Sequence, residues 1–153
     1  MIRFLRLSLV VQIGALLAVL AGNASAQTLV GLWKTVDDDT GKAKSLVRIV
    51  ERDGRVAGRI EKLLDPDDPA DAVCDRCSDE RRNQPILGMT ILRDLRRSDG
   101  GANRWEGGDI LDPENGKVYH VRLTPSPDGR RLDVRGYIGA PLFGRTQTWQ
   151  RVE

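Results

Sequence analysis

Residues 45–63 read SLVRIVERDGRVAGRIEKL, and this stretch indicates how the chain folds. It opens with a β-branched run, 45–51, and closes with a second apolar-polar run, 56–63. Between them lies Arg52-Asp53-Gly54, a turn sequence of the kind that joins two antiparallel strands. The stretch therefore predicts a β-hairpin.

The same pattern of short runs and turns continues on both sides of the hairpin, apart from a long polar segment at about 64–85. Clusters of Gly, Pro, Asn and Asp separate the runs and are typical of turns. We expect eight strands, near residues 28–36, 45–51, 56–63, 89–95, 104–111, 117–123, 131–138 and 146–152. The predicted fold is an all-β, antiparallel up-and-down meander that closes into a barrel, because closure removes the exposed edges of the sheet. A β-sandwich or an open, curled sheet is the alternative.

The first 26 residues have the three parts of a secretory signal. Arg3 and Arg6 precede an apolar run at 7–21, and Ala24-Ser25-Ala26 gives a small-x-small cleavage site. The alternative is a membrane anchor, but the run is short of the ~20 residues that span a bilayer. We therefore expect cleavage after residue 26, a single barrel domain over 27–153, no stable membrane span after cleavage, and a periplasmic or secreted location.

Charge argues against one class of partner. The formal net charge of the whole chain is +2, and the two arginines of the predicted signal account for it. The mature domain is then close to neutral. Nucleic-acid binding depends mainly on neutralising phosphates with basic residues, so we expect no nucleic-acid partner.

Six blocks of sequence form a distinctive set. They are GLWKT (31–35), CDRC (74–77), PILGM (85–89), GDILDPENGKVY (108–119), RGYIG (135–139) and GRTQTWQR (144–151). In this order the blocks resemble the bacterial family catalogued as domain of unknown function 2147. The resemblance covers nearly all of the mature chain and implies a small exported protein. It implies no activity and assigns no catalytic residues.

A second resemblance concerns how the barrel closes. Gly-x-Trp on the first expected strand and an arginine on the last are similar to the closing signature of lipocalin-type and avidin-type barrels. That resemblance implies that Trp33 plugs one barrel end beneath Arg151 or Arg145, through a cation–π contact. Trp149 is expected to belong to the same closing set. The alternative is that Trp33 is simply a core residue.

Cys74 and Cys77 are the two cysteines of the chain, and both lie in the long polar segment. An even number in an oxidising compartment favours a disulfide. A redox-active pair is less favoured, because the strand-to-helix context of such motifs is missing. Metal binding would need further ligands such as Asp71, Asp75 or Asp79. We expect a structural disulfide that shapes the loop.

A barrel of eight strands leaves room for side chains or for one small ligand. We expect a small lipophilic or amphipathic ligand at the barrel mouth, lined by Trp33, Tyr119, Arg135 and Tyr137. Strand alternation places Arg135 and Tyr137 on one face and Val134 on the other. If Arg135 points outward, it does not serve a ligand.

Two other functions stay open. A cell-envelope interaction module would use the Cys74–Cys77 loop and the apolar Pro141-Leu142-Phe143 loop. A small envelope hydrolase would use Asp112 or His120, but the chain has one histidine and no nucleophile-elbow sequence. No catalytic motif, metal site or cofactor is predicted.

Overall fold

The computed structural model describes residues 28–100 and 102–153, so the predicted signal sequence, residues 1–26, lies outside the described residues. Eight strands and one short 3₁₀ helix follow in chain order. They are β1 (Gly31–Val36), β2 (Ala43–Arg52), β3 (Arg55–Leu63), β4 (Thr90–Arg97), β5 (Trp105–Asp112), β6 (Lys117–Pro125), β7 (Arg131–Tyr137), η1 (Pro141–Phe143) and β8 (Arg145–Arg151).

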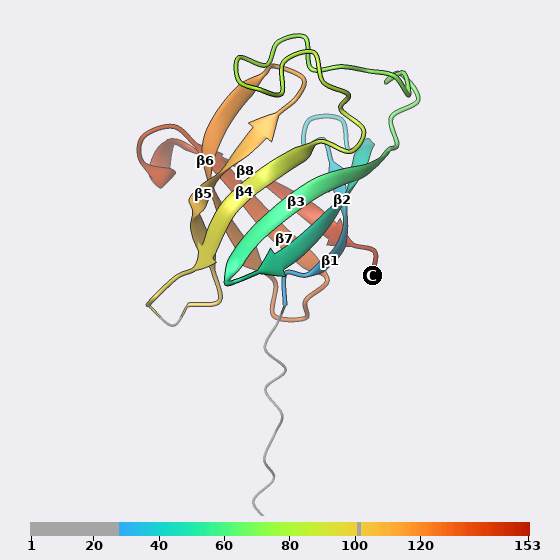
Figure 1. The fold of residues 1–153 in the computed structure, drawn as a ribbon. Coiled ribbons are helices and arrows are strands. Elements are labelled where there is room, and N and C mark those ends of the chain that lie inside the picture. The colour runs from blue at the N-terminus through green and yellow to red at the C-terminus, as the bar shows by residue number, and fades with distance from the viewer. Residues whose placement is uncertain (1–27, 101) are drawn as a thin grey trace, which may run out of the picture.

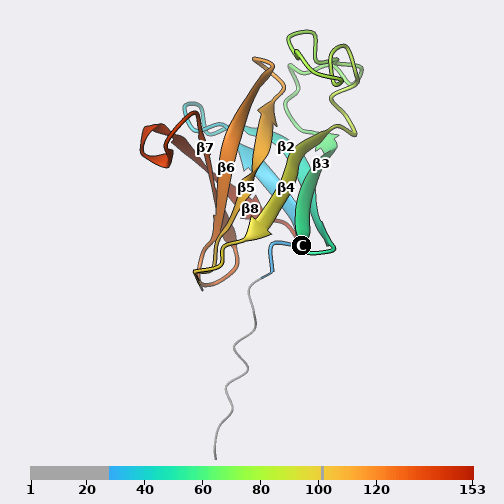
Figure 2. The same ribbon diagram turned by 60° about the vertical axis from the view of Figure 1, so that its left-hand side comes forward.

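The strands form a closed barrel in which each strand pairs with its sequence neighbours and β8 pairs with β1 (Figures 1 and 2). All the pairings are antiparallel. The predicted up-and-down barrel is therefore confirmed. Every expected strand is present, with ends that differ by a few residues.

The β2–β3 connection shows why the sequence closes where it does. Arg52 pairs with Arg55, so Asp53 and Gly54 form a two-residue turn. Their φ angles are 51° and 71°, and positive φ at both positions is what a type I′ hairpin turn requires. The hairpin predicted from this stretch is confirmed.

The two ends of the barrel differ. One end carries the β2–β3, β4–β5 and β6–β7 turns together with the start of β1. The other carries the β1–β2, β5–β6 and β7–β8 connections and the long segment 64–89, which arches over that end in Figure 1. We call these the closed end and the open end. No helix in the described part of the chain is long and apolar enough to cross a bilayer.

Trp33 and Arg151 pack together at the closed end. The Arg151 guanidinium lies 4.2 Å from the centre of the Trp33 ring, and the Trp33 indole N–H donates to the carbonyl of Leu29 at 2.9 Å. Arg151 also donates to the carbonyl oxygens of Gly129 (2.6 Å), Val30 (3.0 Å) and Thr28 (2.6 Å). One cation therefore ties the last strand, the β6–β7 turn and the segment before β1 together.

The disulfide loop covers part of the open end. Cys74 and Cys77 are joined by a disulfide with a Cα–Cα distance of 5.4 Å, and both are fully buried. The loop rests on the β5–β6 turn, where Gly116 has a φ of 71°. A Cβ at Gly116 would lie 2.0 Å from the Arg76 carbonyl oxygen, so this close approach requires glycine.

Candidate functional site

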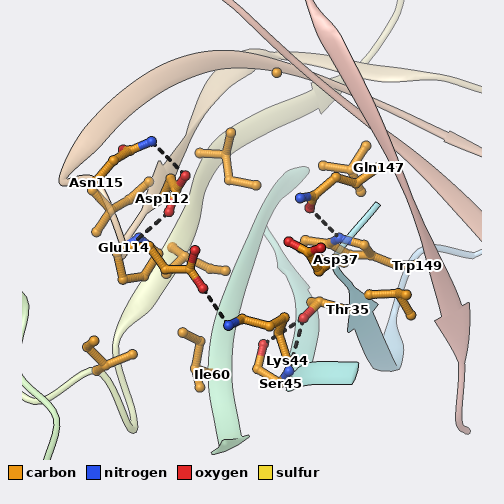
Figure 3. Close-up of a pocket in the computed structure, with 18 of the residues that line it drawn as sticks. Thr35, Asp37, Lys44, Ser45, Ile60, Asp112, Glu114, Asn115, Gln147 and Trp149 are labelled. Atoms are coloured by element: carbon orange, nitrogen blue, oxygen red, sulfur yellow. Dashed lines mark hydrogen bonds and ion pairs between the residues drawn. The ribbon is translucent and has the colours of Figure 1, made fainter. Parts of the chain in front are cut away.

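A cavity of about 330 Å³ opens at the open end, inside the barrel. All eight strands contribute to its wall, and the segment 64–89 adds Asp68 and Ile86. Figure 3 shows the polar side chains arranged around it. The barrel interior is thus packed at the closed end and hollow at the open end.

Apolar side chains form the larger part of the wall. All but one of them come from the strands, and Ile86 comes from the segment 64–89. These residues are Ile60, Leu63, Ile86, Ile91, Ile110, Leu111, Val134 and Trp149. Gly136 adds open space, because a Cβ at this position would meet its nearest atoms only at 3.6 Å or more.

Two polar contacts lie within this wall. The hydroxyls of Thr35 and Ser45 are hydrogen-bonded at 2.9 Å, and both residues are buried. The Trp149 indole N–H donates to the Gln147 side-chain oxygen at 3.4 Å. A ligand entering the cavity therefore meets hydroxyl and amide groups as well as hydrocarbon.

Lys44 ties three segments together at the cavity mouth. It is an extra residue in β2, since Thr35 pairs with Ser45 and the next pair is Val36 with Ala43. Its Nζ lies 2.8 Å from an Asp65 oxygen and 2.7 Å from a Glu114 oxygen, and Figure 3 shows the second contact. Hydrogen bonding to these carboxylates raises the pKa of Lys44, so it stays charged.

Asp112 ends β5 and lines the cavity. Its carboxylate accepts the Glu114 backbone N–H at 2.9 Å and the Asn115 side-chain amide at 2.8 Å. The same amide of Asn115 lies 3.2 Å from the Tyr119 hydroxyl. Burial raises the pKa of Asp112, although the hydrogen bond from Glu114 opposes this effect.

Charged groups of the β1–β2 loop complete the mouth. Arg145 lies 3.3 Å from Asp38 and 3.1 Å from Asp39, and these carboxylates, chiefly Asp39, raise its pKa. Hydrogen bonds from Thr40 lower the pKa of Asp37, which also lines the cavity. Both basic residues of the lining are thus paired with acids, Lys44 with three and Arg145 with two.

The structure brings one of the four predicted ligand residues to the cavity. Tyr119 lines it, whereas Trp33 lies at the closed end beneath Arg151. Arg135 and Tyr137 lie on the other face of β7 from Val134 and Gly136, which line the cavity. Arg135 instead donates to the carbonyls of Pro141 (2.7 Å) and Leu142 (3.2 Å) and to the Thr146 hydroxyl (2.9 Å).

The members of the expected closing set also separate. Trp33 and Arg151 are in contact, but Trp149 pairs with Leu132 and lines the cavity. Arg145, the other arginine considered for Trp33, binds Asp38 and Asp39 at the open end. Trp149 is therefore part of the cavity wall.

The two residues weighed for hydrolysis do not converge. Asp112 lines the cavity, while His120 is an exposed residue of β6 whose ring lies 5.7 Å from that of Tyr137. Within residues 28–100 and 102–153, no group of three or more His, Cys, Asp or Glu side chains could hold a metal ion.

The β7–β8 connection is apolar and exposed, and residues 141–143 of it form η1. Leu142 and Phe143 are each 80% exposed, and Ile138 is 67% exposed. Arg135 binds the backbone carbonyls of Pro141 and Leu142 in this loop. The apolar side chains of the loop are left in solvent.

Several cavity residues escape sequence reasoning. Thr35, Ser45 and Gln147 share faces with the buried Trp33, Val47 and Trp149, two residues away along their strands. Alternation could have found these three positions. Lys44 carries no such signal, because the irregular β2 pairing decides where its side chain points.

A closed antiparallel barrel with a cavity at one end defines a lipocalin-like protein. Among solved structures, the chain is similar to protein HP1028 of the human pathogen Helicobacter pylori, which is described as belonging to the lipocalin family. The TM-score is 0.70 with 24% sequence identity, over 82% of this chain and 84% of that chain. At this identity the likeness shows the fold. No curated protein matches the sequence.

The family is shown by the sequence itself. The chain belongs to the bacterial family described as "uncharacterized protein conserved in bacteria" (DUF2147), whose model matches residues 31–151. The match spans the barrel from the first residue of β1 to the last residue of β8. The family resemblance drawn from the six sequence blocks is thereby confirmed.

Proposed function

We propose that this protein is exported and binds one small lipophilic or amphipathic molecule in the open end of its barrel. The observation that carries the proposal is the cavity of about 330 Å³, with an apolar wall and polar groups at its mouth. Ligand sites in proteins have this character, and their volumes run from roughly 300 to 1,000 Å³. The cavity is at the small end of that range, which favours a single small ligand.

The ligand-contact residues of this proposal follow the cavity. Tyr119 stays in the set, and Ile110, Val134 and Trp149 join it as apolar contacts. Thr35 and Gln147 offer hydrogen bonds inside the wall. Trp33, Arg135 and Tyr137 leave the set, because their side chains are engaged elsewhere.

Export is supported by the disulfide between Cys74 and Cys77. Disulfides persist in oxidising compartments, and the periplasm is one of them. The predicted signal at residues 1–26 points the same way. N-terminal sequencing of the protein from a periplasmic fraction should begin at Gln27, and recovery of an intact Met1 would contradict export by cleavage.

The direct test is native mass spectrometry of the mature protein from the periplasm, with and without denaturation. We expect a co-purifying mass that is lost on denaturation. Gly136→Leu should abolish it by filling the cavity. Gly100→Leu should leave it, because Gly100 lies in an exposed turn at the closed end, where a Cβ would have no atom within 4 Å. A clean apo mass for wild-type protein, with no uptake of any amphiphile afterwards, would contradict the proposal.

A second candidate is a contact module of the cell envelope, and the exposed Leu142 and Phe143 favour it. Soluble proteins rarely leave such side chains together in solvent without a use. Site-specific photo-crosslinking from position 142 in intact cells would test it. An adduct from position 142 and none from position 128, at the closed end, is the supporting result.

A further inference from the structure

We propose that the ligand carries a positively charged head group, a protonated amine on an apolar body, which docks against Asp112 at the cavity mouth. This inference rests on the function proposed above and adds the chemical class of the ligand. The inference follows from which cations and carboxylates of the cavity lining are already paired with one another.

The cavity lining holds more acids than bases. Its ionisable side chains include two cations, Lys44 and Arg145. The carboxylates are Asp37, Asp68, Asp112 and Glu114. An apolar cavity with this rim places an excess of negative charge where the head group of an amphiphile would lie.

Both cations already face carboxylates. Lys44 is held by Asp65 and Glu114 at 2.8 and 2.7 Å, with Asp68 at 4.0 Å. Arg145 is held by Asp38 and Asp39. A carboxylate or phosphate ligand that approached either cation would meet these acids at close range and be repelled by them.

Asp112 is in the opposite position. Its hydrogen-bond donors, which belong to Glu114 and Asn115, are neutral amide groups. Arg145, a cation that acts on it electrostatically, is already bound to two other carboxylates. An ionised carboxylate has about four acceptor positions, so at least one remains for a ligand.

Burial makes a charged Asp112 carboxylate unfavourable unless a cation lies beside it. A partly buried carboxylate bound only by neutral donors is undercompensated, and burial raises the pKa of Asp112 accordingly. An ammonium group brought to it by an apolar tail in the cavity supplies the missing charge and up to three donors. The apolar wall and the mouth carboxylate then bind the two parts of one molecule.

The test compares three probes with the same tail, namely decylamine, 1-decanol and decanoate, below their aggregation concentrations at pH 7. Isothermal titration calorimetry on the ligand-stripped mature protein should give decylamine the tightest binding, at least ~10-fold tighter than decanoate, as expected for one charge-assisted contact. Asp112→Asn should weaken decylamine about 10-fold and leave 1-decanol unchanged. Asp99→Asn, an exposed site at the closed end that removes the same charge, should change neither.

The outcomes separate the inference from the function. Binding of decanoate or 1-decanol as tight as that of decylamine would overturn the cationic head group and leave the ligand-binding function standing. Binding of none of the three would overturn both. If Asp112→Asn fails to fold, the wild-type series still decides, because it needs no variant.

Discussion

The closed and open ends of the barrel are built from the same eight strands, but Arg151 at one end and Lys44 and Arg145 at the other bind different partners. At the closed end a single cation, Arg151, lies over Trp33 and donates to three backbone carbonyls. At the open end Lys44 and Arg145 are matched by three and two carboxylates around a cavity. Side chains pack against one another at the closed end, whereas ion pairs surround a cavity at the open end.

This contrast separates stability from binding. At the closed end, the packing of Trp33 against Arg151 gains dispersion energy and hydrogen bonds that stabilise the fold. At the open end the ion pairs fix the rim while the wall behind it stays unfilled. We therefore expect substitutions at the closed end to alter unfolding and those at the open end to alter binding.

The largest effect is expected at Trp33, which is fully buried. Trp33→Ala should lower the free energy of unfolding by about 3–5 kcal/mol, because it leaves a void in a packed region. Ile86→Ala should cost less than about 2 kcal/mol, because Ile86 lines the cavity and is only partly buried. Urea unfolding followed by circular dichroism gives both values. Equal losses would remove the contrast between the ends.

Arg151→Lys should destabilise the protein by about 2 kcal/mol. Lysine keeps the charge but lacks the planar fork that reaches Gly129, Val30 and Thr28 together. The cavity lies at the other end, so affinity for a bound amphiphile should be unchanged. The matched variant is Arg145→Lys, at the open rim, where the unfolding midpoint should hardly move. A loss below about 0.5 kcal/mol for Arg151→Lys would argue that the three carbonyl contacts of the guanidinium contribute little to stability.

Removal of the disulfide should cost about 1–2 kcal/mol, since the loop it closes is very short. The double variant Cys74→Ser with Cys77→Ser should loosen the segment 64–89 while the closed end stays intact. Limited proteolysis should then cut first within that segment. Cleavage starting at the β6–β7 turn instead would show that the loop does not depend on the bond.

Acid should weaken the ion pairs that hold the segment 64–89 over the open end. Arg81 holds the pKa of Asp79 at about 2 by hydrogen bonding, and Lys44 lowers the pKa of Asp65. Both folded pKa values lie below the unfolded value of ~3.9, so these contacts stabilise fully above about pH 4. Their contribution is lost as the pH falls through the folded pKa values. The carbonyls that bind Arg151 do not titrate in this range.

Amide NMR spectra between pH 5 and pH 2 would check this order. Signals from residues 64–89 should shift or broaden before those of Trp33, whose indole N–H donates to the Leu29 carbonyl, and of Arg151. Simultaneous loss of both sets would mean that the two ends open as one cooperative unit.

The smallest effect is expected at the exposed loop. Phe143→Ser should change the free energy of unfolding by no more than about 0.5 kcal/mol, because the 80% exposed ring loses almost no packing. Thermal unfolding of the variant beside wild type would measure it. A large loss would mean that the ring packs onto the barrel in solution.

Much of the fold could be predicted from the sequence because it is local. Asp53-Gly54 gives a turn with two positive φ angles, and the β-branched runs beside it have the length of strands. The candidate site was harder to predict. Tyr119 was expected at the mouth and lines it, but Arg135 was expected there and binds the β7–β8 loop instead. Alternation groups residues by face without saying which face is inside.

The sequence by itself determined the strands, the turns, the order of the barrel and the family to which the chain belongs. Only the tertiary structure decided that Lys44 turns to the mouth at a strand irregularity, that Trp149 lines a cavity, and that Asp112 accepts its hydrogen bonds from neutral donors. The physical reason is the separation along the chain of the residues that interact. Turn and strand preferences act between neighbours along the chain, whereas a cavity and its charges are set by strands that meet only when the barrel closes.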